Sequence, residues 1–502
     1  MNRRAHDAVL LTLLLAAWGT ASGQGYLLRV DSRAQSVAYR GVLLDSIPLG
    51  SVVTGPNGGP QTPDGYAVSC APGAAYCEFY RPGLEQHGAP LVFGTDLTAW
   101  GFGIHGLSFH GDARLGMDLG DAAGVWPGTA PAFQLLEAYL DYARDWFSGR
   151  VGREVVRGRL GYTGFDGGLV SASYRAWGLS ADGYLGLGLA RGVALPVTSP
   201  ALNPLDDFQP QKRQLVAGAD GAWQFSRGEL HLEYQREVDR ETRNFVSERV
   251  AMSASLRPVA GWNLSGGADY DIARGFWGSS DAHLGYSRPR WGATAGARRY
   301  RPYFDLWTIW GVFSPVPYTA VDGSIWMTPV PALDLHGSGE RYWYDDPAAE
   351  TPLQPVEQDG WRWSGGIGVA IARDWSGAGD YQREFGPGAA SNGWSLNLTW
   401  QPSARFTLGA AGGRQVRPLE FRYEQSEVNW FGLQADLRPT SRLRVSANAT
   451  EYAELRDRPD ASAFDWNQVR LSASVSWLLG SGGDGPPLPP PVRAPAPPPE
   501  SQ

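Results

Sequence analysis

The sequence predicts an all-β protein, a transmembrane antiparallel up-and-down β-barrel of about 18–22 strands. Three observations lead to this fold class. Apolar and polar residues alternate in segment after segment, an export signal opens the chain, and the links between the expected strands are short at one end and long at the other. After residue 23 no apolar run is long enough to cross a bilayer as a helix.

The alternation is clearest just before the C-terminal tail. Successive side chains of a strand point to opposite faces, so a period of two gives one apolar and one polar face. We interpret residues 464–480 as the closing strand of the barrel, which must pair with the first strand so that no edge is left in lipid. Its apolar face consists of Val469, Leu471, Ala473, Val475 and Trp477. The same pattern recurs in residues 107–119, 262–270, 394–400 and 443–450.

Residues 1–23 have the features of a secretory signal peptide. Arg3 and Arg4 precede an apolar run at residues 8–18, and Ala21, Ser22 and Gly23 are small residues suited to cleavage. The run is too short to span a membrane as a helix. We therefore expect an exported protein in the outer membrane of a Gram-negative-type bacterium, with both termini in the periplasm.

Composition agrees with a barrel and excludes one class of partner. The chain has 65 Gly, 21 Trp and 21 Tyr, and its mean hydropathy is −0.29, as expected when apolar and polar residues alternate. The net charge of −8 argues against a nucleic-acid partner, which requires a basic surface.

Residues 24–96 form an N-terminal segment with a first strand at 36–45 and a long Pro/Gly-rich surface loop. Cys70 and Cys77 flank a Pro-Gly turn in this loop, which predicts a local disulfide in an exported protein. Two thiols without a nearby histidine do not make a metal site. An alternative interpretation makes this segment a small plug.

The barrel is expected over residues 97–480. The lengths of the links between its strands indicate which end of the barrel faces the periplasm. Pro-containing short turns are expected at residues 257–260, 288–290, 329–331, 401–404 and 438–441, with weaker candidates at 148–149, 181–183 and 376–377. Longer links are expected at residues 191–213, 238–245, 301–317, 344–360 and 417–427. Short periplasmic turns and long extracellular loops are typical of outer-membrane barrels. A β-propeller is the rival architecture, but no blade motif repeats.

Tryptophans lie beside many of the expected short turns. Amphipathic rings prefer the boundary between lipid and water, so these residues predict an aromatic girdle. Its expected members are Trp146, Trp177, Trp262, Trp291, Trp326, Trp375, Trp400 and Trp477. The alternative is that they are ordinary strand aromatics.

Residues 481–502 form a tail in which about half of residues 486–502 are proline, which predicts an extended, disordered periplasmic segment. It would serve as a spacer toward the cell wall, as a ligand for a periplasmic protein, or simply as an unstructured end.

We find no catalytic, metal-ligand or phosphate-loop motif, and we expect neither an enzyme nor a cofactor. Catalytic sets assembled across strands leave no such motif. His110 and His231, on expected polar faces, are therefore the first residues to test for a phospholipase-like activity.

Charged residues concentrate at one stretch of the expected lumen wall. Arg150, Arg153, Arg157 and Arg159 lie close together with Glu154 among them. Carboxylates on the preceding strand would set a transverse field across an aqueous pore. The expected pore-lining residues beyond this stretch are Glu137, Asp141, Arg298, Arg444 and Arg470, with Arg414 as a further candidate. The alternative is that these charges only pair with neighbours in the wall.

Gly152, Arg153 and Glu154 resemble the Gly-Arg-Gln-type strand of outer-membrane porins and alginate-export-like channels, and residues 161–167 resemble the loop that follows it. This chain has Glu154 where those proteins usually carry Gln. The resemblance implies a passive diffusion or export channel with charged residues at its constriction.

The sequence thus favours a porin-like channel for small polar or charged solutes or an exported polysaccharide, in contact with outer-membrane lipid. The alternatives are a structural or assembly barrel and an outer-membrane enzyme.

Overall fold

The computed structural model describes residues 25–55, 58–120, 133–189, 214–240, 243, 245–301, 317–345, 359–386, 389–417, 425–457 and 466–481. The expected signal peptide, the expected loop at 191–213 and the tail beyond residue 481 lie outside the described residues.

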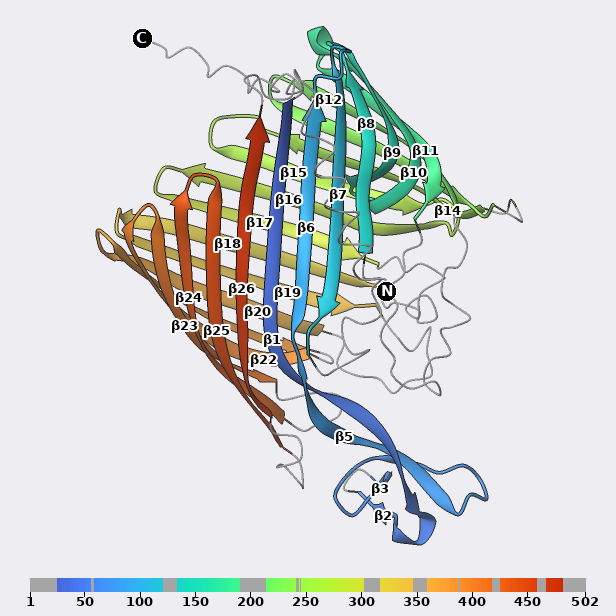
Figure 1. Ribbon diagram of the computed structural model, residues 1–502, viewed down its shortest axis with the longest axis vertical. Coiled ribbons are helices and arrows are strands. Elements are labelled where there is room, and N and C mark those ends of the chain that lie inside the picture. The colour runs from blue at the N-terminus through green and yellow to red at the C-terminus, as the bar shows by residue number, and fades with distance from the viewer. Residues whose placement is uncertain are drawn as a thin grey trace, which may run out of the picture.

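The described strands form one large antiparallel sheet that closes on itself (Figure 1). It contains 24 strands, and without β4 and β5, which lie in an extension, 22 strands remain in the barrel wall. The wall consists of β1 (Gly25–Pro48), β6 (Pro90–Trp100), β7 (Leu107–Asp118), β8 (Phe133–Ala143), β9 (Phe147–Gly158), β10 (Gly161–Tyr174), β11 (Leu179–Gly188), β12 (Leu215–Phe225), β13 (Gly228–Val238), β14 (Phe245–Leu256), β15 (Trp262–Asp271), β16 (Phe276–Arg288), β17 (Trp291–Tyr300), β18 (Tyr318–Val330), β19 (Leu333–Tyr344), β20 (Asp359–Ala372), β21 (Trp375–Gly386), β22 (Ala389–Ser403), β23 (Phe406–Arg417), β24 (Gln425–Thr440), β25 (Leu443–Asp457) and β26 (Trp466–Ser481).

The last strand closes the barrel against the first. β26 pairs with β1 from Tyr26 opposite Ser481 to Ser36 opposite Leu471. The other edge of β1 pairs with β6. The predicted fold class and its closing strand are therefore confirmed, and the wall begins at β1, well before residue 97. Among the described ranges, no helix is long and apolar enough to cross a membrane.

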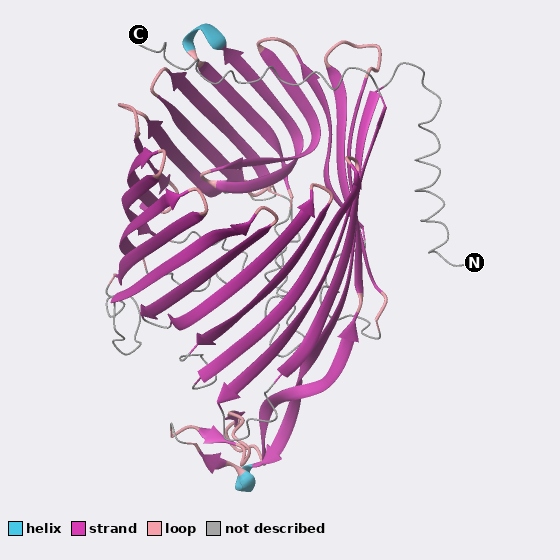
Figure 2. Cartoon of the chain, turned by 90° about the vertical axis from the view of Figure 1, so that its left-hand side faces the viewer, coloured by secondary structure: helices cyan, strands magenta, loops and turns pink. Residues whose placement is uncertain are grey.

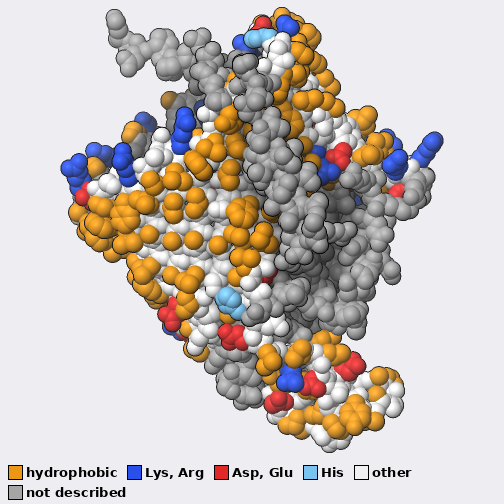
Figure 3. Space-filling model, viewed as in Figure 1, with side chains coloured by type: hydrophobic (Ala, Val, Ile, Leu, Met, Phe, Trp, Pro, Cys, Tyr) orange, Lys and Arg blue, Asp and Glu red, His pale blue; other side chains and the backbone are white. Residues whose placement is uncertain are grey.

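The two faces of the wall differ as the alternation predicts. Leu264, Leu396 and Leu471 are among the large apolar side chains left exposed on the outer face. Figure 3 shows such side chains as a broad orange belt over the strands. The inner face carries the polar residues of the same strands. Exposed apolar area of this extent is stable only in contact with lipid, so the fold is that of a transmembrane β-barrel.

The links confirm the predicted asymmetry. The five Pro-containing turns all join strands at the end of the barrel where β26 finishes, and the described parts of the predicted long links lie at the opposite end. The three weaker turn predictions were wrong by a few residues. Residues 148–149, 181–183 and 376–377 lie inside β9, β11 and β21, and the links occupy 144–146, 175–178 and 373–374. Gly and Ser occur there as small strand residues rather than as turn residues. The 175–178 link contains the short helix η2 (Arg175–Trp177).

An extension projects from the long-link end, at the lower right of Figure 1. The second half of β1 continues beyond the wall and pairs with β5 (Tyr76–Gly88), from Val37 opposite Gly88 to Pro48 opposite Tyr76. The expected first strand at 36–45 thus belongs mostly to this hairpin. The expected long loop is instead a folded tip, and it stands off the barrel rather than plugging it. The tip contains η1 (Leu49–Ser51), β2 (Val53–Thr54), β3 (Pro60–Gln61) and β4 (Val68–Ser69).

A small core and a disulfide hold the tip together. Tyr66, Val68 and Phe79 pack around Cys77, which is fully buried and bonded to Cys70. The predicted disulfide is confirmed. On the exposed side of the hairpin, the Ser46 backbone N–H donates to Asp45 and lowers the pKa of its carboxyl, and the Arg81 guanidinium acts in the same direction.

Candidate functional site

The hairpin β9–β10 leaves the wall before it reaches its tip. β8 pairs with β9 only as far as Ala138 opposite Arg153. β10 pairs with β11 only from Phe165, opposite Gly188, onward. Between these points β9 and β10 pair with each other up to the turn at Arg159 and Leu160. Residues 154–164 therefore form a two-stranded ribbon that belongs to no wall ladder in the described part of the chain, and Figures 1 and 2 show strands curving away from the straight wall there.

Two glycines permit the bend. Gly152 has a φ of 143°, a conformation that residues with a Cβ rarely adopt. A Cβ at Gly152 would lie 2.2 Å from the Ala138 carbonyl oxygen, and one at Gly167 would lie 2.1 Å from that of Leu185. Both glycines therefore allow the hairpin to press against neighbouring backbone where it departs from the wall.

The tip of the hairpin binds the inner face of the wall several strands away. The Glu233 carboxylate of β13 accepts hydrogen bonds from the backbone N–H groups of Arg159, at 2.9 Å, and Leu160, at 3.1 Å. The Arg159 guanidinium reaches further, to the Asp281 carboxylate of β16 at 2.6 Å and the Ser279 hydroxyl at 3.3 Å. The hairpin is therefore folded into the lumen and fixed at its end.

A buried polar network lies behind the tip. The Gln235 side chain, 1% exposed, donates to Thr163 of the hairpin and to Glu237, both at 2.9 Å. The Arg249 guanidinium donates to the side-chain amide oxygen of Gln235 at 3.2 Å. Buried polar groups paired in this way are costly to separate, because each would lose its partner away from water.

An aromatic contact completes the attachment. Phe165 at the base of the ribbon is fully buried and stacks on Tyr184 of β11, with ring centroids 5.2 Å apart. Val216 of β12 closes the cluster, which Val156 and Leu169 border. One side of the hairpin is thus dry and packed on the wall, and the lumen is narrower by its thickness.

Three of the predicted pore residues come together on the inner face of β8 and β9. The Arg150 Nε lies 3.7 Å from the Asp141 carboxylate, and its guanidinium covers the Tyr139 ring at 5.2 Å. Glu137 lies 3.5 Å from His110 of β7. This part of the lumen wall therefore carries charges of both signs at close range.

The other residues of the arginine-rich stretch have different surroundings. Arg153 forms two hydrogen bonds with Asp166 on the reverse face of the hairpin, at 2.7 and 3.0 Å. Arg157 lies over the Tyr162 ring. Glu154 is 2% exposed and packed toward the wall. Residues 161–167, expected to be a loop, are the start of β10.

The remaining candidates are spread around the lumen. Arg298 pairs with Glu340 at 2.7 Å, Arg444 with Asp436 at 2.6 Å, and Arg470 covers the Tyr452 ring. They share the inner face but do not meet at one constriction. Arg414 lies instead on the outer face, opposite Trp394 in the ladder.

Most of the expected girdle tryptophans have outward positions near the short turns. Trp262 and Trp291 both contact Tyr286, with ring centroids 4.9 and 5.3 Å apart, and Trp375 stacks on Trp400. Trp477 continues the outer face of β26, and Trp146 and Trp177 lie exposed in the links themselves.

Trp326 departs from this arrangement. It pairs with His336 and Gly292 on the inner face, and its indole occupies the space above Gly292. A girdle position was therefore wrong for Trp326, because distance from a turn does not tell which face a side chain takes. Trp223, exposed near the β12–β13 link, takes an outer position that the sequence analysis did not include.

Sequence reasoning missed the residues that hold the hairpin. Glu233, Gln235 and Asp281 occupy polar-face positions like those of many other strands, so nothing in the sequence marks them. The available signal was the two-residue turn Arg159–Leu160 between Gly158 and Gly161, which is short for the end of the barrel that carries the long links.

The two histidines chosen as tests of catalysis both lie near carboxylates. His110 lies 3.7 Å from Asp96 and 3.5 Å from Glu137, and His231 lies 3.7 Å from Glu229. Within the described residues, no group of three or more His, Cys, Asp or Glu side chains is arranged to hold a metal ion.

The fold and the lumen together define a transmembrane β-barrel whose interior is polar and narrowed by an inward-folded hairpin. No protein-family model matches the chain, and no curated protein matches it. Solved structures with a similar overall shape do exist. The ferric enterobactin receptor PfeA of Pseudomonas aeruginosa, in complex with BCV-L6, is 10% identical, with a TM-score of 0.49 over 91% of this chain and 82% of its own.

Two porin structures also resemble the chain over most of its length. A BenF-like porin from Pseudomonas fluorescens Pf-5 is 9% identical, with a TM-score of 0.41 over 92% of this chain and 100% of its own. Pseudomonas aeruginosa OpdK with vanillate is 10% identical, with a TM-score of 0.38 over 91% of this chain and 99% of its own.

Proposed function

We propose that the protein is an outer-membrane channel through which small polar or charged solutes diffuse, and that the β9–β10 hairpin sets its width. The observation that carries this proposal is the attachment of the hairpin tip to Glu233 and Asp281 inside the barrel. A wall of 22 strands encloses far more space than its own side chains fill. A fixed ribbon across part of that space narrows the lumen and thereby limits which solutes can pass.

The charges on the narrowed section favour polar cargo. Arg150 faces the lumen beside Asp141, with Glu137 and His110 nearby, so a passing solute meets both signs of charge within a few ångströms. Such a field orients dipolar and charged solutes and disfavours apolar ones. An exported polysaccharide is the larger cargo implied by the resemblance to alginate-export channels.

In the proposed orientation the short turns and both termini face the periplasm, as in other outer-membrane barrels. The extension with its disulfide then faces the outside. The proline-rich tail at 481–502 lies in the periplasm, where it would act as a spacer toward the cell wall or contact a periplasmic protein.

Single-channel recording in a planar lipid bilayer tests the proposal. We expect a steady conductance, and we expect Arg150→Gln to shift the anion-to-cation preference. Arg414→Gln is the matched control, because Arg414 lies on the outer face of the wall, away from the lumen. A protein that inserts but conducts no ions would contradict the channel. Equal shifts from both variants would contradict the assignment of Arg150 to the narrow section.

A further inference from the structure

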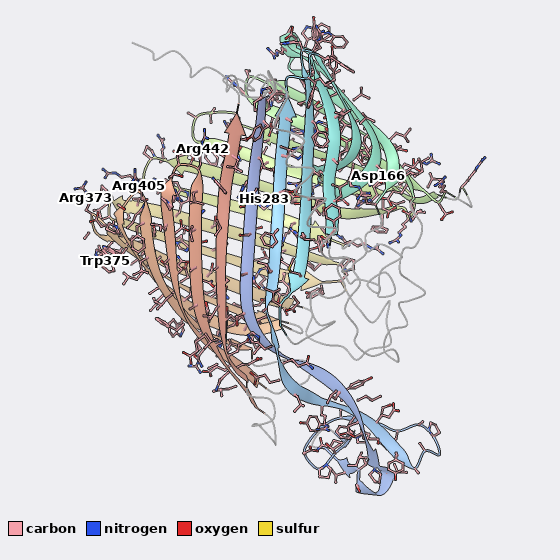
Figure 4. The ribbon with its side chains drawn as sticks, in the orientation of Figure 1. Asp166, His283, Arg373, Trp375, Arg405 and Arg442 are labelled. Carbon is pink, nitrogen blue, oxygen red and sulfur yellow. A yellow bond between two sulfur atoms is a disulfide. The ribbon has the colours of Figure 1, made fainter. Side chains whose placement is uncertain are left out.

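Arginines gather at the short-turn end of the barrel. Figure 3 shows blue side chains along this rim at the upper left, and Figure 4 labels three of them, from three successive links. Nearly every short link has at least one arginine in it or in the last residues of the strand that leads to it. These residues are Arg144, Arg175, Arg227, Arg257, Arg288, Arg290, Arg373, Arg405, Arg438 and Arg442.

At one place on this rim the arginines line a pocket. It has a volume of about 600 Å³ and lies where the β22–β23 and β24–β25 turns meet the seam between β26 and β1. Its arginines are Arg29, Arg405, Arg438, Arg442 and Arg444. Ser441 and Ser476 add hydroxyl groups, and Leu443 and Leu478 add apolar surface.

The pocket is built on paired backbone. The Arg438 N–H donates to the Arg405 carbonyl at 2.7 Å, and the Leu478 N–H donates to the Arg442 carbonyl at 2.8 Å. These bonds tie each turn to the neighbouring strand. The guanidinium groups therefore project from a fixed frame rather than from independent loops.

The positive charge in the pocket is only partly neutralised. Asp436 pairs with Arg444 at 2.6 Å and lies 3.7 Å from Arg438, and Asp31 pairs with Arg29 at 2.8 Å. Within the described residues, the side chains of Arg405 and Arg442 form no ion pair or hydrogen bond. Two guanidinium groups are thus free to bind an anion, beside three others that share two carboxylates.

We propose that this pocket binds a phosphate-type oxyanion, with Arg405 and Arg442 as its principal ligands. A guanidinium group binds phosphate through two parallel N–H donors. Several such groups around one pocket supply more positive charge and more donors than a singly charged ion such as chloride can use. The phosphate comes either from a soluble ion at the mouth of the barrel or from a lipid headgroup at the rim. Leu443, opposite Trp477 on the outer face, is compatible with the second source. The site does not depend on conduction through the lumen.

The test uses the full-length protein in detergent and in nanodiscs. Inorganic phosphate is titrated by calorimetry into the detergent-solubilised protein, with chloride as the comparison. Phosphatidylglycerol retention is measured by native mass spectrometry against phosphatidylcholine. The variant is Arg405→Gln with Arg442→Gln. The control, Arg227→Gln with Arg373→Gln, removes the same charge from turns outside the pocket.

We expect saturable binding of phosphate or phosphatidylglycerol that weakens by about tenfold or more in the pocket variant and stays within about twofold in the control. Binding of the soluble ion alone identifies a solute site, and retention of the lipid alone identifies a headgroup site. Equal losses of binding in both variants would mean that binding depends only on the total charge of the rim, which would overturn the proposal. Absence of saturable binding for both probes would overturn it as well.

Discussion

The Glu233 carboxylate accepts a hydrogen bond from the backbone N–H of Arg159 at 2.9 Å, although the two residues are 74 positions apart and β13 is not a neighbour of β9 or β10 in the wall. One acidic side chain of β13 thereby caps a turn that would otherwise end in the open lumen. An ionised acceptor makes such bonds stronger than those between neutral groups. The free width of the lumen therefore depends on the hydrogen bonds between the tip of the β9–β10 hairpin and β13.

Replacing this carboxylate should release the hairpin. Glu233→Ala removes both acceptors of the turn at a cost of about 3 kcal/mol or more, because two charge-assisted hydrogen bonds are lost. We expect a larger and noisier single-channel conductance as the tip moves. Glu229→Ala, on the same face of β13 but away from the tip, should conduct like the parent protein. Identical traces for all three proteins would show that the tip does not limit the flow.

The bend at Gly152 should not tolerate a side chain. Gly152→Ala forces a Cβ onto the Ala138 carbonyl oxygen in a backbone conformation with positive φ, and such strain costs about 1–3 kcal/mol. We expect a lower folded fraction on refolding, read from the heat-dependent shift of the folded barrel on gels. Gly149→Ala is the control, since its Cβ would have ordinary contacts. Equal stability of the two variants would contradict the bend as described.

The assignment of wall faces predicts a strong difference between adjacent residues. Leu433 lies on the outer face near the middle of β24, and Gln434 lies on the inner face. An arginine facing lipid near the midplane costs about 2–4 kcal/mol. We expect Leu433→Arg to lose that much stability in urea unfolding from lipid vesicles, while Gln434→Arg loses little. The reverse order would place the lipid on the other face.

The disulfide should stabilise the extension and not the barrel. Removing Cys70–Cys77 with two serine substitutions frees a short loop in the tip, at a local cost of about 2–3 kcal/mol. We expect faster proteolysis within residues 49–75 and an unchanged barrel transition on heating. Cys77 is buried among Tyr66, Val68 and Phe79, so the serine also places a hydroxyl in an apolar core. A barrel transition that shifts together with the tip would contradict this independence.

The wall itself could be predicted from the sequence because its determinants are local. Alternation fixes the two faces strand by strand, as in residues 469–477 of β26, and proline marks the turns at 257–260 and 438–441. Glycine-containing strand positions were harder to interpret. Residues 181–183 resemble a turn in composition, yet they form a strand because small residues also fit between closely spaced neighbours in a ladder.

The constriction could not be predicted, because it arises from contacts between distant segments. Neither Glu233 nor Asp281 differs from other acids on polar faces until the hairpin is placed beside it. Alternation along β9 places Arg153 and Arg157 on the face opposite to Arg150, but that the other face of the ribbon packs on the wall follows only from the inward fold at Gly152. The misplacement of Trp326 has a similar cause, since the face depends on register within β18 rather than on proximity to a turn.

Because β1 pairs with β26, the barrel can close only after the last strand has been synthesised. The N-terminal strand is synthesised first and the strand that completes it is synthesised last, so one edge of β1 waits without hydrogen-bond partners while the rest of the polypeptide emerges. The extension can mature during this interval, because β1 and β5 are both among the earliest segments made. A chain truncated before residue 466 would keep two unsealed edges, and we expect periplasmic quality control to degrade it rather than allow it to assemble.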